Sequence, residues 1–354
     1  MLTAIVFLPL AGSVVIALFV RSVRLVRYIA GAIAFAELFM VLWAFTRFDL
    51  NRSGMQLVER VDWISALKIE YFLGVDGLSL PMVLLTSLLG LCAVYASWNI
   101  KERVREYFVC LLMLQTAVTG VFVSLDFVLF FIFWELELIP MFLLISIWGT
   151  GRCEYSAMKF LIFTALGSAF MLAAMLILFF STGTFDMVAL GQMDLTNLLI
   201  PTQAVFLMFF ATFAIKLPVW PFHTWLPDAH TDAPTAVSVM LAGVLLKMGG
   251  YGLIRIGVGM FPEVISDLAF PIAVLATISV LYGAMVVLRQ TDLKRLIAFS
   301  SVSHMGFVLL GVSSVGAEFG KVGSVGLNGA AMQMFTHGTI TGLLFLTGGL
   351  VYDR

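Results

Sequence analysis

Long apolar runs are the feature that most restricts how this chain can fold. They recur along the whole sequence, separated by short segments with charged residues, glycine or proline, and most are long enough to cross a bilayer as a helix. Such runs favour a helical bundle over a β-barrel, whose segments are short and alternating. We expect an all-α polytopic membrane protein of about eleven helices, near residues 2–20, 28–46, 78–98, 106–123, 126–148, 157–181, 202–217 with a continuation past Pro218, 235–259, 268–288, 294–314 and 326–350.

The composition supports a lipid bilayer as the surroundings of this chain. Hydrophobic residues make up 61% of it and charged residues only 12%, against about 25% charged residues in soluble proteins. The net charge of −1 does not suggest a nucleic-acid partner. Cys92, Cys110 and Cys153 lie far apart and form no ligand motif, so no disulfide or metal site is predicted. The first apolar run has no basic segment before it, so we interpret it as a retained helix.

Basic residues alternate between the connections. With the N-terminus outside, the inner connections hold Arg21, Arg24 and Arg27, then Lys101, Arg103 and Arg105, then Arg152, then Arg289, Lys294 and Arg295. The short outer connections are nearly free of Lys and Arg, with Lys321 as the exception. Because Lys and Arg collect on the cytoplasmic side, the pattern predicts an outer N-terminus. We interpret residues 47–77, of mixed charge, as an outer loop on the protein surface.

Five ionisable side chains fall near the middle of predicted spans: Glu135, Lys216, Lys247, His304 and His337. A Lys or Glu at that depth costs about 2.5–3.5 kcal/mol, so such residues normally face the bundle interior and pair. A static ion pair between helices is one interpretation. Two lysines and two histidines at one level exceed what such a pair requires, and favour a proton relay. An opposite charge at 4 Å supplies about 4 kcal/mol at a dielectric constant of 20, enough to switch a lysine.

The segment between the two lysines contains four prolines. Pro218 should break its helix directly after Lys216, because proline donates no backbone hydrogen bond. Irregular backbone at membrane depth is tolerated where it is buried in protein or lines a cavity, as in transporters. A plain proline kink is the alternative.

Further polar residues lie near these groups. His223, Asp228 and His230 flank the break, and lack regular metal-ligand spacing; we expect a proton entry or a hydrogen-bond cluster there. Glu137, two residues after Glu135, should point to a different helix face and not share its role. Glu37 also falls mid-span, and the sequence offers no account of it.

Five stretches together resemble the antiporter-like subunit of respiratory complex I called chain M or subunit 4. They are FLGVDGLSLPMVLLT (72–86), FFIFWELELIPMFLLISIWG (130–149), AIKLPVWPFHTWLPDAHTDAPTAVSVMLAGVLLK (214–247), DLKRLIAFSSVSHMGF (292–307) and FTHG (335–338). The resemblance covers essentially the whole chain. The WELELIP form is similar to the cyanobacterial branch, which implies a bacterial inner membrane or a thylakoid-type membrane.

The resemblance implies a fourteen-helix fold with two inverted five-helix repeats, each with a broken helix. Residues 1–103 would form the N-terminal helices and outer loop, 104–262 the first repeat and 263–354 part of the second. Because the chain ends after the equivalent of helix eleven, we expect a C-terminally truncated piece. In the family, the glutamate matching Glu135 pairs with the lysine matching Lys216. The lysine matching Lys247 continues the relay, helped by histidines matching His304 and His337.

The implied function is proton translocation coupled to quinone reduction, in the membrane arm of an NAD(P)H- or ferredoxin-quinone oxidoreductase. We expect no cofactor in this chain; NAD(P)H or ferredoxin, flavin, iron–sulfur clusters and quinone would belong to partner subunits. The neighbouring partners would be other membrane subunits of the same complex. A subunit of an Mrp-type cation/proton antiporter, a membrane-bound hydrogenase subunit and a purely structural scaffold are the alternatives.

Overall fold

The computed structural model describes residues 1–316 and 322–352, and these are almost entirely helical. Ten helices in this part of the chain are long and apolar enough to cross a membrane, and an eleventh, shorter apolar helix spans Thr202–Lys216. The expected all-α membrane fold is confirmed. Lys321, the expected exception to the basic-residue pattern, lies outside the described residues.

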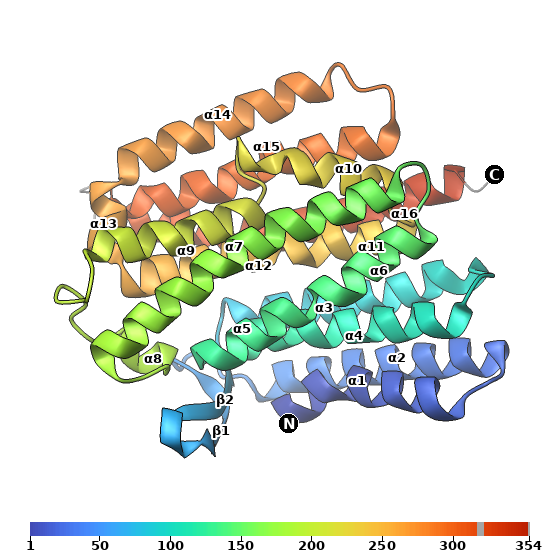
Figure 1. Ribbon diagram of the computed structural model, residues 1–354, viewed down its shortest axis with the longest axis horizontal. Helices are drawn as coiled ribbons and strands as arrows, with labels where there is room; N and C mark the ends of the chain where they lie inside the picture. The colour runs from blue at the N-terminus through green and yellow to red at the C-terminus, as the bar shows by residue number, and fades with distance from the viewer. Residues whose placement is uncertain (317–321, 353–354) are drawn as a thin grey trace.

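The helices lie roughly along one direction in Figure 1, with α1 and α2 at one side of the bundle and α14 at the other. The long ones are α1 (Leu2–Phe19), α2 (Val23–Arg47), α3 (Ser79–Ala96), α4 (Val104–Val123), α7 (Cys153–Thr182), α14 (Ala269–Val287), α15 (Leu293–Ser313) and α16 (Val322–Tyr352). Two short helices, α8 (Met187–Leu190) and α13 (Pro262–Asp267), connect longer ones. The 3₁₀ turns η2 (Ser97–Asn99) and η6 (Ser314–Gly316) follow α3 and α15, and η1 (Ser65–Leu67) lies between the two strands described below. α4 is buried along most of its length, so it forms part of the bundle centre.

Three spans are interrupted. One consists of α5 (Phe127–Leu136) and α6 (Leu138–Trp148), which meet at Glu137. The second is α9 (Thr202–Lys216), followed across a break by η3 (Phe222–Thr224) and α10 (Trp225–Asp232). The third alternates between α-helical and wider π-helical turns, in the order α11 (Thr235–Met240), η4 (Leu241–Leu245), α12 (Leu246–Gly252) and η5 (Leu253–Val258). The predicted break after Lys216 is therefore confirmed.

The segment expected to be an outer loop forms a β-hairpin instead. Strands β1 (Gln56–Ile64) and β2 (Ile69–Val75) pair antiparallel and project from the bundle beside α8 and the N-terminus. The Glu59 carboxylate accepts hydrogen bonds from the Met1 amine and the Leu2 amide. The expectation of a loop was wrong because the strands are pinned by such contacts with distant residues, which a local pattern does not reveal.

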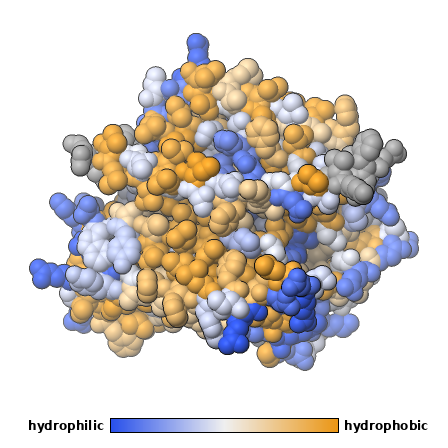
Figure 2. All heavy atoms as spheres, turned by 180° about the vertical axis from the view of Figure 1, so that it is seen from behind, coloured by the Kyte–Doolittle hydropathy of each residue, from blue (hydrophilic) through white to orange (hydrophobic). Residues whose placement is uncertain are grey.

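The outer surface is apolar. Figure 2 shows hydrophobic residues over most of the middle of one face, with hydrophilic side chains gathered toward its edges. Large exposed side chains such as Phe35 and Phe39 of α2 and Leu281 and Met285 of α14 would be in water in a soluble protein. A surface of this kind suits lipid or neighbouring membrane subunits.

Candidate functional site

The first part of the site is a buried ion pair. The Lys216 ammonium contacts the Glu137 carboxylate, and the two side chains are 1% and 0% exposed. The rings of Trp134 and Phe160 lie 5.6 and 5.3 Å from the Lys216 ammonium. Opposite charges and aromatic faces thus compensate for the loss of water around this cation.

The expected pairing of Glu135 with Lys216 is wrong. Glu137 is the partner, while Glu135 is half-buried and its Oε1 has no hydrogen-bond partner among the described residues. Glu135 lies in the last turn of α5, and Glu137 is the residue at which α5 and α6 meet. Pro140 cannot donate to the carbonyl of Leu136, which explains why the helix is interrupted there. Residue spacing showed that the glutamates point in different directions, but not which direction leads to α9.

The break after Lys216 is built so that its backbone groups remain bonded. The Val219 amide donates to the Ala214 carbonyl at 2.9 Å, and the Trp225 indole donates to the Ile215 carbonyl at 2.9 Å. Lys216 therefore ends its helix beside an irregular but well-bonded segment. Such segments occur at membrane depth where protein surrounds them.

The second part of the site is Lys247, which has only neutral partners. Its ammonium donates to the Ala242 carbonyl and lies 2.8 Å from Nδ1 of His337, and the Lys247 side chain is fully buried. Ala242 belongs to the π-helical segment η4, whose wider turn leaves this carbonyl available. No carboxylate of the described residues lies within 4 Å of Lys247.

His304 extends this group to the protein surface. Its ring centre lies 5.4 Å from that of His337, and its Nδ1 lies 3.1 Å from the Gln333 amide nitrogen. The structure thus brings Lys247, His337 and His304 together from three helices. His304 is exposed rather than interior, since α15 buries the face that carries Met305 and Val308 instead.

Small residues allow the close helix packing that joins the two parts. A Cβ atom on Gly249 would lie 2.7 Å from the Leu217 amide nitrogen, so α12 packs directly on the residue that follows Lys216. A Cβ atom on Gly338 would lie 2.6 Å from the Gly243 carbonyl oxygen. This contact brings α16, with His337, against the π-helical turn before Lys247.

His223, Asp228 and His230 do not form one cluster. His223 packs edge-on against Tyr282, and His230 stacks on Phe345 with a ring-centre distance of 4.7 Å. Asp228 instead pairs with Lys159 of α7 at 2.7 Å and lies 3.8 Å from Arg295 of α15.

A hydrogen bond also joins α10 to α7. The Asp232 carboxylate of α10 accepts a hydrogen bond from the Ser156 hydroxyl of α7 at 2.5 Å. These contacts fix the second half of the broken helix to its neighbours. In the described part of the chain no group of three His, Cys, Asp or Glu residues could hold a metal ion.

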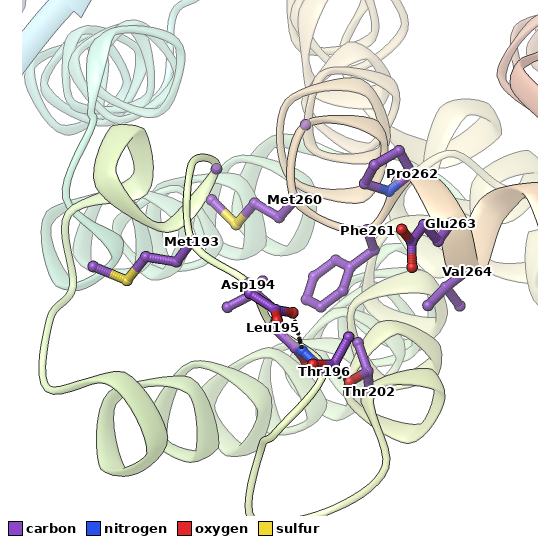
Figure 3. Close-up of a pocket in the computed structure, with 12 residues that line it drawn as sticks. Met193, Asp194, Leu195, Thr196, Thr202, Met260, Phe261, Pro262, Glu263 and Val264 are labelled. Atoms are coloured by element: carbon purple, nitrogen blue, oxygen red, sulfur yellow. Dashed lines mark hydrogen bonds between the residues drawn. The ribbon is translucent and has the colours of Figure 1, made fainter.

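Two cavities lie at opposite ends of the bundle. One of about 320 Å³, drawn in Figure 3, lies between residues 191–196 and 259–264; Asp194 there caps the Thr196 amide at 2.9 Å. It contains no buried ionisable group. The other, of about 570 Å³, is lined by Lys101, Tyr107, Thr235 and Lys294 among others, and lies where the helix that carries Lys247 begins.

Known proteins resemble this chain over its full length. Residues 124–354 match the family model for the membrane region of NADH:quinone oxidoreductase and Mrp antiporters, and residues 1–120 match the amino terminus of NADH-ubiquinone oxidoreductase chain 4. NADH-quinone oxidoreductase subunit M of Rhodobacter capsulatus is 42% identical over 370 residues, covering 100% of this chain and 70% of that protein. The chain belongs to the subunit M/chain 4 family. An NAD(P)H-quinone oxidoreductase chain 4 of Thermosynechococcus vestitus is 43% identical over 358 residues, covering 100% of this chain and 65% of its own length.

Solved structures of two membrane complexes share the fold. A chain of respiratory complex I from Thermus thermophilus superimposes with a TM-score of 0.88 at 28% identity, covering 100% of this chain and 72% of that one. A chain of the Mrp complex from Dietzia, at 22% identity and a TM-score of 0.80, shares the fold. The chain thus spans about two thirds of the length of the curated relatives.

Proposed function

We propose that this chain is a membrane subunit of a proton-translocating NAD(P)H- or ferredoxin-quinone oxidoreductase, and that it carries protons through buried Glu, Lys and His side chains. The observation that carries the proposal is the buried Lys216–Glu137 ion pair at the end of a broken helix. The chemistry of electron transfer would belong to partner subunits. They would supply the NAD(P)H or ferredoxin site, the flavin, the iron–sulfur clusters and the quinone.

In this proposal Glu137 and Lys216 form the switch and Lys247, His337 and His304 carry the proton onward. Movement of the Glu137 carboxylate away from Lys216 removes the counter-charge that holds the lysine proton. Lys247 has His337 as a proton acceptor at 2.8 Å, so a proton can pass between them by exchange along one hydrogen bond. Glu135, half-buried beside the pair, serves as an auxiliary carboxylate.

We further assign the larger cavity as the water-filled entrance. It lies at the end of the bundle where Arg27, Lys101 and Lys294 cluster: the Arg27 side chain donates to the Ile100 carbonyl and Lys294 to the Ala233 carbonyl. A basic end is typical of the cytoplasmic side, which supports our proposal that the N-terminus and the hairpin lie outside. His230 and Asp228 lie on the helix that ends at this cavity.

We propose the domain division that the family resemblance implies. Residues 1–103 form the N-terminal helices with the hairpin, 104–262 the first repeat around the Lys216 break, and 263–354 part of the second repeat. A bacterial inner membrane or a thylakoid-type membrane is the proposed location.

An Mrp-type antiporter subunit and a hydrogenase-type subunit remain the competing functions. Their support is the shared fold, seen also in the membrane-bound sulfane sulfur reductase at 22% identity and a TM-score of 0.83. The curated relatives from Rhodobacter capsulatus and Thermosynechococcus vestitus are quinone oxidoreductase subunits, which favours the first function.

The test is Lys216→Ala in the assembled complex, with quinone reduction and proton uptake measured in the same sealed vesicles. We expect the ratio of protons moved to quinone reduced to fall. Lys68→Ala, at an exposed lysine of the hairpin, is the control. An undiminished ratio in Lys216→Ala would exclude the role given to this lysine, and sodium-dependent flux without quinone reduction would favour the antiporter.

A further inference from the structure

A second fully buried glutamate lies apart from the relay. Glu37 occupies the buried face of α2, in line with Ala30, Ala34 and Val41, and its side chain is 0% exposed. Its two carboxyl oxygens face α4, where the Gln115 amide nitrogen and the Thr119 hydroxyl contact them, the latter at 3.3 Å. Glu37 therefore joins α2 to α4 through contacts with two uncharged polar side chains.

The described helices that pack on α2 offer no counter-charge near Glu37. α1 and α3, which pack on α2, contain no Asp, Glu, Lys, Arg or His within Leu2–Phe19 and Ser79–Ala96. The only charged residues of α4 are Arg105 and Glu106, in its first turn. Arg27 and Arg47 of α2 are ten residues away from Glu37, about 15 Å along the helix.

The other titratable groups of these helices are tyrosines and cysteines, which offer no positive charge. They are Tyr28 of α2, Cys92 and Tyr95 of α3, and Tyr107 and Cys110 of α4. A buried carboxylate without a cation is strongly disfavoured, and such a group takes up a proton instead. The surroundings of Glu37 thus favour the neutral acid.

The hydrogen-bond inventory gives an independent argument. The Gln115 side chain is completely buried, yet its Oε1 has no partner in the described part of the chain. A carboxylate offers only acceptors, whereas a protonated carboxyl adds one O–H donor. A protonated Glu37 can therefore pair with this amide through two hydrogen bonds, its O–H donating to Oε1 of Gln115 while Nε2 of Gln115 donates to its other oxygen. Gly90 leaves room for this amide, since a Cβ atom there would lie 2.5 Å from it.

We propose that Glu37 is a permanently occupied proton-binding site, a neutral carboxylic acid that ties α2 to α4 through Gln115 and Thr119 and takes no part in proton transfer. α3 packs between this site and the Gly243–Gly338 contact beside Lys247: Gly90 faces Gln115, while Leu89 faces Gly243. Neither α1 nor α3 carries an Asp, Glu, Lys, Arg or His that could pass a proton from this site to the relay.

The primary test is infrared spectroscopy of the full protein in its native complex, comparing wild type with Glu37→Gln. We expect the variant to lose one protonated-acid carbonyl band at neutral pH. Glu106→Gln, at an exposed position of α4, is the matched control and should keep this band. If Glu37→Gln keeps every acid band of the wild type, Glu37 is ionised and the proposal is overturned.

Transport and rescue give the second test. Proton movement in Glu37→Gln should stay within twofold of wild type, and a larger loss would place Glu37 in the relay. Glu37→Leu should lower the unfolding temperature, because it leaves the Gln115 amide unpaired. The double variant Glu37→Gln/Gln115→Glu keeps one acid and one amide across the same contact. It should therefore regain the acid band that Glu37→Gln loses and the unfolding temperature of the wild type. Failure to regain either would overturn the pairing of Glu37 with Gln115. The infrared band does not depend on transport, so this inference can fail separately from the proposed function.

Discussion

The two buried lysines, Lys216 and Lys247, both lie beside irregular helix but contact different groups. Each lies beside an irregular turn of helix, and each is at most 1% exposed. Lys216 contacts the carboxylate of Glu137, whereas Lys247 contacts a carbonyl and an imidazole. A counter-ion favours retention of the lysine proton, and neutral partners do not. In the proposed relay, Lys216 would respond to a movement of Glu137, while Lys247 would pass its proton to His337 without such a movement.

The largest expected effect comes from removing the charge of Glu137. Glu137→Gln leaves the Lys216 ammonium buried without a counter-charge, which should cost about 3–5 kcal/mol of the free energy of unfolding and stop proton transport. Glu135→Gln is the matched control and should have a much smaller effect on both. Denaturant unfolding in detergent and proton uptake in vesicles measure the two quantities. A larger loss in Glu135→Gln than in Glu137→Gln would instead support the pairing of Glu135 with Lys216 that the family resemblance implies.

Lys247→Ala should separate transport from stability. The substitution leaves only neutral groups unpaired, so it should cost about 1–3 kcal/mol, less than Lys216→Ala, which leaves the Glu137 carboxylate unpaired. Proton transport should nevertheless be lost, because the donor to His337 is gone. Unfolding of the two variants under the same conditions compares them. Equal losses of stability would remove the distinction drawn between the lysines.

A third variant changes the packing between the two lysines without touching either. The added methyl group in Gly249→Ala would meet the backbone of Leu217 and Phe213, and such overpacking costs about 1–3 kcal/mol. We expect lower stability together with slower proton transport. Gly329→Ala is the control, since a Cβ atom there meets nothing within 4 Å. If both variants unfold alike, the close approach of α12 to α9 is unimportant.

The smallest expected effect concerns the C-terminal end of the span that carries Lys247. There Arg255 pairs with Asp76 at 2.7 Å, and Asp76 also caps the start of α3 through the amides of Leu78 and Ser79. Burial by itself would raise the pKa of Asp76, but the Arg255 charge and these hydrogen bonds bring it below its usual value. A depressed carboxyl pKa stabilises the fold above the unfolded value and loses that contribution as the pH falls through the folded value.

Asp76→Asn should therefore cost about 1 kcal/mol at pH 7 and little once the pH is well below the ordinary pKa of about 4. Thermal unfolding at several pH values measures this dependence. Asp62→Asn, at an exposed position of β1, should show no such change. A constant difference between wild type and Asp76→Asn at every pH would show that the charge of Asp76 is irrelevant.

Much of the fold could be predicted from hydrophobic runs and breaks. The expected span at 2–20 is α1 (Leu2–Phe19), and the one at 268–288 is α14 (Ala269–Val287). The break after Lys216 followed from Pro218 alone, because a missing backbone donor is a local property. The β-hairpin could not be predicted, since its strands are fixed by contacts with the N-terminus and with Asp186.

The candidate site was only partly predictable. The sequence alone predicted Lys247 and His337 near the middle of apolar helices and Lys216 at the break of another, because these positions follow from their distance to the ends of apolar runs. Only the tertiary structure decided that Lys216 meets Glu137 and not Glu135, that His304 lies at the surface, and that Glu37 meets Gln115. The physical reason is that depth is set along one helix, whereas a partner is set by the rotation of two helices about their axes, and packing against the rest of the bundle fixes that rotation.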